Sequence, residues 1–450
     1  MNIKQFYDDA LAHASYAVVS EGKMAVVDPA RDPKPYYDFA KEQNAEIVAV
    51  FETHPHADFV SSHLQIHKEK NAIIYVSGKV GADYPHEAFD GGKELSIGKI
   101  TFKAIDTPGH SPDSITIVAT DRDSGEQAAF TGDTLFVGDV GRPDLRESAG
   151  KIKAKREQLA EDMYDTIHNK LLKLSDETLV YPAHGAGSLC GKNMSSENSS
   201  VMSKEKETNW ALQEMSKESF VKSLLEDQPF VPKYFGYDVD INKEGAESFE
   251  KSTADVKRLS GTDEIPGGSL IIDVRQQEEF KKGHLEGSIN IMLTEGDKFE
   301  TWLGSTVNPG EEFYLVASDK KQLEGAIKRS AKIGYEKQIR GAAVATGNLK
   351  EKTPILDLDK FKSNQSDFTI VDIRNASEVK EGKIFENAIA IPLHELRERA
   401  NELPGDKPVV VHCAGGFRSA AGASILEDKL NTDVYDLSVA IKEFNQKVSA

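Results

Sequence analysis

Three short polar groups in the first half of the sequence combine residue types that bind metal ions. They are His54-Pro55-His56-Ala57-Asp58, Thr107-Pro108-Gly109-His110 and Thr131-Gly132-Asp133. Imidazole and carboxylate groups ligate first-row metals, and two His with one Asp form a facial triad that leaves coordination positions open. Because the three groups agree in residue type, they predict one metal centre. An isolated loop histidine is usually solvated, and we expect this of the remaining loop histidines His13, His67, His86 and His168.

A second group that could perform chemistry lies near the carboxyl end, around Cys413. An apolar run precedes this cysteine, and a glycine-containing loop and a helix-forming run follow it. The thiol is therefore expected among backbone N–H groups at the positive end of a helix, which lowers the pKa of a thiol and stabilises anionic sulfur. The alternative is a buried, inert cysteine. Cys190 is the only other cysteine, so a disulfide scaffold is excluded.

Short strands must position the metal-binding groups. Apolar runs at residues 47–51, 99–106 and 128–131 end just before His54, His110 and Asp133. Polar residues at the carboxyl ends of strands are typical of α/β active sites. Helices are expected over 35–44, 152–174 and 205–225, and further strands over 16–20, 23–28, 73–77, 114–120 and 178–181.

The second half of the sequence contains an internal repeat. Residues 270–275 and 368–374 are apolar runs that each end in Asp-aliphatic-Arg, and a second β-rich run follows each of them, at 312–317 and 408–412. Two copies of an α/β unit of about a hundred residues account for this spacing.

Composition restricts the class of protein. The 450 residues correspond to about three domains. The net charge is −19, from 55 basic and 74 acidic residues without a basic block, which argues against nucleic-acid binding. No apolar run approaches the ~18 residues of a membrane span, and the first residues lack a secretory pattern. We expect a cytoplasmic, globular protein without membrane contact.

The metal-binding groups resemble the metallo-β-lactamase superfamily, whose signature is HxHxDH followed by a later His, Asp and His. The matching residues are His54, His56, Asp58, His110, Asp133 and His184. Position 59 is Phe where the signature has His. In two-metal members that histidine, with the residues matching Asp58, Asp133 and His184, holds the second ion. Because a carbon ring cannot coordinate a metal, the second site is expected to be weak or absent.

Within this superfamily the sequence resembles the persulfide dioxygenases, through residues 132–136 and 141–144. The resemblance implies one Fe(II) per chain, held by His54, His110 and Asp133, with O₂ as co-substrate. The implied reaction oxidises a low-molecular-weight thiol persulfide to sulfite. His56 and Asp58 would orient ligands or bound water, and His184 would supply a nearby hydrogen bond. Arg142 is expected either to hold Asp144 in a structural ion pair or to bind the anionic part of the substrate.

The loop from Cys413 to Arg418 resembles the active loop of rhodanese-type sulfurtransferases, Cys-x-x-x-x-Arg. The resemblance implies that Cys413 carries a persulfide and that Arg418 adds positive charge for thiosulfate or sulfite. The cradle would consist of the backbone amides of Ala414, Gly415, Gly416 and Phe417. The middle repeat resembles the same fold, but Ser318 and Leu323 stand at the Cys and Arg places. A serine hydroxyl cannot form a persulfide, so this unit is expected to be inactive.

Cys190 follows His184 by six residues, so it lies close enough in sequence to approach the metal. It is either a sulfur relay between the two sites or a structural thiol.

Together the resemblances imply an α/β architecture: a metallo-β-lactamase-like αββα sandwich over residues 1–240, then an inactive rhodanese-like domain over 245–350 and an active one over 352–450, both with parallel sheets. This is the arrangement of the fused bacterial persulfide dioxygenase-sulfurtransferases of sulfide detoxification, with thiosulfate as product, and we expect a homo-oligomer. One alternative is a zinc-dependent glutathione thioester hydrolase fused to a sulfurtransferase. Another is a non-catalytic, metal-stabilised sulfur carrier or scaffold.

Overall fold

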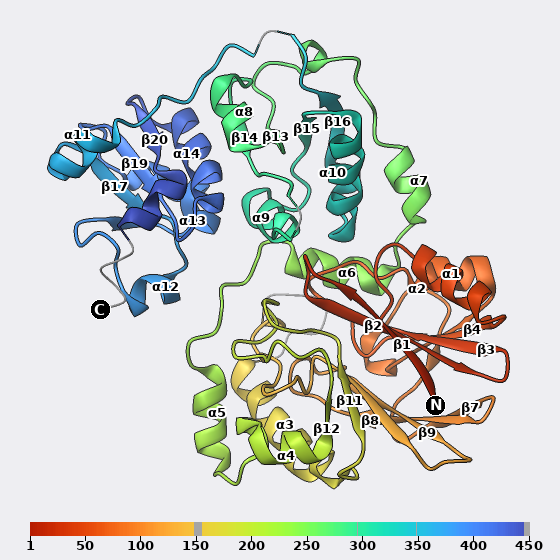
Figure 1. The fold of residues 1–450 in the computed structure, drawn as a ribbon. Helices are drawn as coiled ribbons and strands as arrows, with labels where there is room; N and C mark the ends of the chain where they lie inside the picture. The colour runs from red at the N-terminus through yellow and green to blue at the C-terminus, as the bar shows by residue number, and fades with distance from the viewer. Residues whose placement is uncertain (148–154, 295, 348, 445–450) are drawn as a thin grey trace. The chain divides into compact units, whose positions relative to one another are not determined.

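The structure, a computed structural model, describes residues 1–147, 155–294, 296–347 and 349–444 (Figure 1). The chain forms two compact units. The first contains Met1–Lys251 with Lys332–Gly334, and the second contains Ser252–Ala331 with Tyr335–Ala450. Among the described residues, no helix combines the length and the apolarity that crossing a bilayer requires.

The first unit contains two mixed six-stranded sheets. The first sheet runs in chain order through β1 (Asn2–Asp8), β2 (His13–Ser20), β3 (Lys23–Val27), β4 (Glu46–Phe51), β5 (Ile73–Val76) and β6 (Glu87–Ala88). β1 to β3 pair antiparallel, and β3 to β6 pair parallel. The second has the order β12 (Ser200–Val201), β11 (Leu179–Pro182), β10 (Gln127–Gly132), β9 (Ile115–Asp121), β8 (Ile100–Asp106) and β7 (Glu94–Ile97). In it only β10 and β11 are parallel.

The main core of this unit lies between the two sheets, where Phe51 packs against Phe102 with ring centroids 4.9 Å apart. The outer face of the first sheet is covered by α1 (Lys34–Glu42) and α2 (His63–Lys70). The outer face of the second is covered by α3 (Arg156–Asn169) and α5 (Lys217–Leu225). Burial on both faces explains the apolar runs of the strands. The predicted αββα sandwich is confirmed.

Two helix predictions were wrong in extent. The expected helix 205–225 is two helices, α4 (Met202–Thr208) and α5, because Asn209 and Ser216 interrupt it with side-chain oxygens that accept from Ala211 N and Ser219 N. Such residues favour caps over helix interiors. The expected helix 152–174 is α-helical only as α3, followed by a short 3₁₀ helix over Leu171–Lys173, and residues 152–154 lie outside the described part of the chain. After α5 come α6 (Phe235–Glu244) and α7 (Phe249–Ala254).

The second unit contains two four-stranded parallel sheets with the same topology, which explains the sequence repeat. The first has the order β14 (Ser288–Asn290), β13 (Ile271–Asp273), β15 (Phe313–Ala317) and β16 (Ile339–Val344). The second has the order β18 (Ile389–Ala390), β17 (Thr369–Asp372), β19 (Val409–His412) and β20 (Val434–Asp436). The helices are α8 (Gln277–Lys282), α9 (Phe299–Thr306), α10 (Lys320–Lys332), α11 (Leu358–Ser363), α12 (Ala376–Glu381), α13 (Leu393–Arg399) and α14 (Phe417–Lys429).

The repeated Asp-aliphatic-Arg motif makes the same contacts in both copies. The Nη2 atom of Arg275 donates to Asp273 at 2.6 Å and to the Gly283 carbonyl at 2.9 Å. The Nη2 atom of Arg374 likewise donates to Asp372 at 2.7 Å, and to the carbonyl at the end of α12 at 2.9 Å. Each buried ion pair therefore connects the end of the first strand to the helix that follows it.

Candidate metal centre and sulfur-transfer loop

The structure brings His54, His110 and Asp133 together at the carboxyl ends of β4, β8 and β10. Asp133 Oδ2 lies 3.8 Å from His54 Nε2 and 3.6 Å from His110 Nε2. All three residues are buried, and their potential ligand atoms lie within 4.8 Å of one another. The two sheets thus present two imidazoles and one carboxylate to a common point.

Neighbouring groups fix the orientation of both imidazoles. Thr53 Oγ1 donates to Asp28 and lies 3.1 Å from His54 Nδ1, so it is placed to accept from that nitrogen. Gly132 makes this approach possible, because with φ of +52° a Cβ atom there would lie 2.4 Å from Thr53 Oγ1. His110 Nδ1 lies 2.9 Å from the Arg142 carbonyl. With Nδ1 engaged, each Nε2 is left as a metal ligand.

The donor set fits a divalent first-row metal. His54 Nε2 and Asp133 Oδ2 are buried and have no hydrogen-bond partner among the described residues. Burial lowers the pKa of His54 and of His110, so both are neutral, as ligation requires. Burial opposes ionisation of Asp133, but His184 and the other imidazoles hold the pKa of this carboxyl well below its usual range. Two neutral imidazoles and one carboxylate suit Fe, Zn, Mn or Ni alike.

His184 lies between two carboxylates. Its Nδ1 is 2.7 Å from Asp133 Oδ1, and its Nε2 is 2.8 Å from Asp58 Oδ2. Burial lowers the pKa of His184, but Asp133 and Asp58 outweigh burial and raise it to about 10. His56 Nε2 lies 3.4 Å from Asp28 Oδ1. The sequence-predicted group of His56, Asp58 and His184 therefore surrounds the candidate ligands.

Phe59 and His13 fill the space beside this group. The buried ring of Phe59 has its centroid 3.8 Å from that of His13 and 4.5 Å from that of His56. The prediction that His13 is solvated was wrong, because it begins β2, forms a bridge to His184 and is buried. The apolar run that follows His13 was the available signal. His67, His86 and His168 are half-buried.

Arg142 is buried and its guanidinium is fully engaged by protein groups. It donates to both oxygens of Asp144 at 2.7 Å and to the carbonyls of Leu189, Pro229 and Phe230. These bonds use all five of its N–H groups. The geometry favours the structural ion pair over substrate binding, and the Arg142 backbone acts on the site through His110.

Cys190 lies beside the candidate metal centre. Its sulfur is within 4.8 Å of ligand atoms of Asp58 and His184, and the residue is buried. Burial and the two nearby aspartates raise the pKa of this thiol well above its usual value. A neutral, enclosed thiol is a poor nucleophile. The relay interpretation stays a prediction: the thiol lies beside the candidate metal centre, and its ionisation is unfavourable.

The Cys413 loop has the geometry of an anion cradle. The sulfur accepts a hydrogen bond from Gly416 N at 3.1 Å, and α14 starts at Phe417. Gly416 has φ of +100°, and a Cβ atom there would lie 2.8 Å from the backbone of Ser438. Cys413 is buried, whereas Ala414 and Gly415 are exposed beside it. Arg418, which sequence reasoning assigned to an anionic ligand, donates to Glu378 instead.

The corresponding loop of the middle repeat is closed by its own side chains. Ser318 Oγ donates to Glu279 at 2.7 Å, and Ser318 N donates to Gln322 Oε1 at 2.8 Å. Gln322 also donates to the Val274 carbonyl at 3.1 Å, and Leu323 is buried. Gln322 therefore takes the amide that would otherwise face an anion.

Comparisons with known proteins agree with this architecture. A family profile described as the metallo-beta-lactamase superfamily matches residues 8–184, and the rhodanese-like domain matches 252–341 and 357–447. A crystal structure of a metallo-beta-lactamase from Staphylococcus aureus subsp. aureus COL is 32% identical, with a TM-score of 0.68, and the match covers 77% of this chain and 99% of that one.

Two curated relatives with different names each match more than a third of this chain, at similar identity. The mitochondrial persulfide dioxygenase of Homo sapiens is 25% identical over 166 residues, which is 36% of this chain and 60% of that protein. A probable hydroxyacylglutathione hydrolase of Schizosaccharomyces pombe is 31% identical over 169 residues, 37% of this chain and 58% of that protein. This chain belongs to the metallo-β-lactamase superfamily, and its second half carries two rhodanese-like domains.

Proposed function

We propose that this chain is a non-haem Fe(II) persulfide dioxygenase-sulfurtransferase, with domains at residues 1–240, 245–350 and 352–450. The observation that carries the proposal is the convergence of His54, His110 and Asp133, with Phe59 beside Asp58 where two-metal relatives supply another imidazole. A thiol-bearing loop in the same chain supports a second sulfur reaction.

The first reaction is RSSH + O₂ + H₂O → RSH + SO₃²⁻ + 2H⁺. Fe(II) held by His54, His110 and Asp133 would supply coordination positions open to sulfur and O₂, which would lower the entropic cost of their encounter. Thr53 and the Arg142 carbonyl hold the two imidazoles in orientation. His184 holds a proton between Asp58 and Asp133 and so fixes both carboxylates.

The second reaction transfers one sulfur atom through Cys413. Its thiolate attacks the outer sulfur of RSSH, the S–S bond breaks, and RS⁻ leaves with the bonding electrons. Sulfite then attacks the outer sulfur of the Cys413 persulfide, which forms thiosulfate and returns the thiolate. The Gly416 N–H stabilises the anionic sulfur at both stages.

A zinc-dependent thioester hydrolase is the second candidate, favoured by the match to the hydroxyacylglutathione hydrolase. Oxygen uptake separates the two. Anaerobically purified chain is loaded with Fe(II) or Zn(II) and given glutathione persulfide or coenzyme A persulfide. We expect uptake that requires both iron and persulfide, and its loss in Asp133→Asn but not in Asp123→Asn, an exposed aspartate. Absence of uptake with either metal, together with hydrolysis of a glutathione thioester, overturns the dioxygenase.

The role of Cys413 has its own test. Cys413→Ser should leave oxygen uptake intact and shift the product from thiosulfate to sulfite. An unchanged thiosulfate yield would remove Cys413 from the reaction.

A further inference from the structure

Ser438 has an unusual backbone conformation directly beneath the Cys413 loop. Its φ of +51° lies in the left-handed region, which costs energy for a residue with a side chain. Two hydrogen bonds hold this conformation: Ser438 N donates to Asp436 Oδ1, and Ser438 Oγ donates to Gln277 Oε1, both at 2.8 Å. Gln277, which accepts the second bond, belongs to α8 in the middle rhodanese-like domain.

The backbone of Ser438 supports the turn that binds sulfur. A Cβ atom at Gly416 would lie 2.8 Å from Ser438 C and 2.8 Å from Val439 N, so the peptide after Ser438 packs directly against this glycine. The N–H of the same glycine donates to Cys413 Sγ. A shift of Ser438 would therefore move the amide that contacts the reactive sulfur.

A second residue of α8 completes the connection. Lys281 forms an ion pair with Asp436 Oδ2 at 2.6 Å and donates to Gln277 Oε1 at 3.0 Å. One oxygen of Asp436 thus faces Ser438, and the other faces Lys281. The side-chain oxygen Oε1 of Gln277 accepts from both Ser438 Oγ and Lys281 Nζ, so it lies at the centre of the hydrogen bonds that connect α8 to Ser438 and Asp436.

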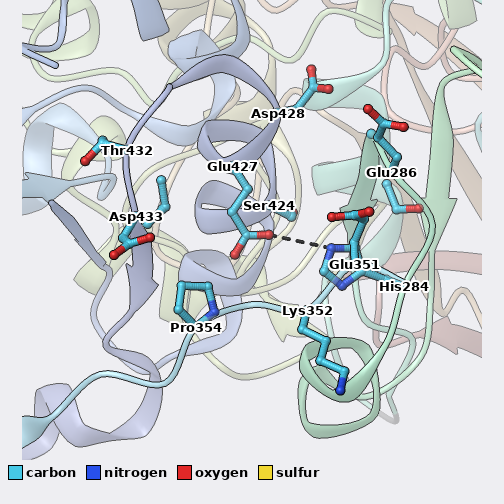
Figure 2. A pocket seen from close by; sticks show the side chains of 13 residues that line it. His284, Glu286, Glu351, Lys352, Pro354, Ser424, Glu427, Asp428, Thr432 and Asp433 are labelled. Atoms are coloured by element: carbon cyan, nitrogen blue, oxygen red, sulfur yellow. Dashed lines mark ion pairs between the residues drawn. The ribbon is translucent and has the colours of Figure 1, made fainter. Parts of the chain in front are cut away.

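Other contacts join the middle domain to α14 without involving Gln277 or Ser438. The guanidinium carbon of Arg418 lies 5.6 Å from the centroid of the Trp302 ring. Asn290 N donates to Ser424 Oγ at 3.0 Å. His284 and Glu427 approach to 3.7 Å across a pocket of about 280 Å³ (Figure 2). These contacts provide variants that loosen the same interface without touching Ser438.

We propose that Gln277 is a positioning residue for sulfur transfer: through Ser438 it holds the Gly416 amide against Cys413, and this gives the inactive rhodanese-like domain its role. The proposal rests on the sulfur transfer proposed above. Gln277 does not touch the reacting atoms, so its effect must appear in the properties of Cys413 and in turnover, not in donor binding.

The first measurement is the pH dependence of Cys413 alkylation by iodoacetamide in the full-length chain, read by mass spectrometry so that Cys190 is counted separately. Loss of the Gly416 contact destabilises the thiolate, so Gln277→Ala should shift the alkylation midpoint upward by about one pH unit. Gln277→Glu, which keeps an acceptor for Ser438, should restore the wild-type midpoint. Ser424→Ala, the matched interface control, should not move it.

The second measurement is thiosulfate:cyanide sulfurtransferase activity of the same proteins. Gln277→Ala should lower kcat about ten-fold and leave KM for thiosulfate within about two-fold. Ser438→Ala should match Gln277→Ala, and the double variant should be no worse than Gln277→Ala, since both single variants remove the Ser438–Gln277 hydrogen bond. Ser438→Ala also serves as the second variant where Gln277→Ala does not fold.

The outcomes separate the two proposals. A wild-type chain without sulfurtransferase activity contradicts the proposed transfer through Cys413, while the alkylation profiles still test Gln277. Equal alkylation midpoints for wild type and Gln277→Ala overturn the positioning role, as does an equal shift in Ser424→Ala, which would indicate a general effect of the interface.

Discussion

The guanidinium of Arg418 and the carboxylate of Glu378 form a two-point ion pair, with N–O distances of 2.6 and 2.7 Å. Burial raises the pKa of Glu378, but Arg418 outweighs burial and lowers it. The positive charge expected beside Cys413 is therefore largely neutralised within the protein. In the sulfur transfer proposed above, the remaining attraction for anionic sulfur then comes from backbone N–H groups such as that of Gly416, which suits a monoanionic persulfide better than a dianionic donor.

Glu378→Gln should improve the use of thiosulfate as sulfur donor. The substitution leaves Arg418 with an uncompensated charge near Cys413, and a glutamine retains the cap that Glu378 provides to Asn375 N at the start of α12. We expect KM for thiosulfate to fall about five- to ten-fold, corresponding to ~1–1.4 kcal/mol. Steady-state kinetics at low ionic strength measure this.

Glu381→Gln is the matched control, because it removes the same charge from an exposed position on the same helix. An equal fall in KM for both variants would assign the effect to overall charge and contradict a specific role for the Arg418–Glu378 pair.

Phe59→His should create a second metal position. Asp58 and His184 already lie 2.8 Å apart in the same buried region, and a third imidazole supplies the ligand that the phenyl ring cannot. After zinc loading and gel filtration, metal content should rise from about one toward about two ions per chain. Phe59→Leu changes the packing but adds no ligand, so it should remain near one. A content near two in wild type would contradict the blocking role of Phe59.

Arg142→Lys should destabilise the first unit more than it weakens substrate binding. A lysine keeps the charge but cannot make the two-point contact with Asp144 or reach the three carbonyls together. We expect a loss of roughly 2–4 kcal/mol in the free energy of unfolding and weaker metal retention, because the Arg142 carbonyl orients His110. Urea unfolding and metal analysis measure these, with the exposed Arg122→Lys as control. A raised KM for persulfide with unchanged stability would instead assign Arg142 to the substrate.

The parts of the fold and site that could be predicted from sequence are those encoded by local patterns. Asp372 and Arg374 stand two residues apart at the end of an apolar run, so their pairing in each repeat follows from a short motif. His54, His110 and Asp133 each follow the carboxyl end of a strand. Their convergence was predictable because folds of this kind bring the carboxyl ends of their strands together at one side of the sheets.

The parts that could not be predicted depend on contacts between distant segments. Glu378 precedes Arg418 by 40 positions, and neither residue alone indicates the ion pair. His13 looked solvated because its burial results from the bridge to His184, far along the chain. Gln277 carries no catalytic signature and acquires a role only because the two repeats pack against each other.

Glu427→Gln should stabilise the second unit in a pH-dependent manner. Burial raises the pKa of Glu427 to about 7, from 4.5, and the lowered pKa of His284 leaves that neighbour uncharged above this pH. The folded state then binds the proton more tightly than the unfolded state, so the contribution to stability is full below pH 4.5 and is lost as pH rises through 7. A change of one in the pKa of a group corresponds to at most about 1.4 kcal/mol in the free energy of unfolding, and partial solvent access of Glu427 reduces this value. Calorimetry should show a higher Tm for the variant at pH 8, by roughly 2–4 °C per kcal/mol recovered, and no difference at pH 4.5.

Glu386→Gln, at an exposed position of the same domain, is the control and should show no change in Tm at either pH. A gain in Tm that is independent of pH would contradict titration of Glu427 as the cause, because the argument requires the stabilisation to appear only where Glu427 loses its proton.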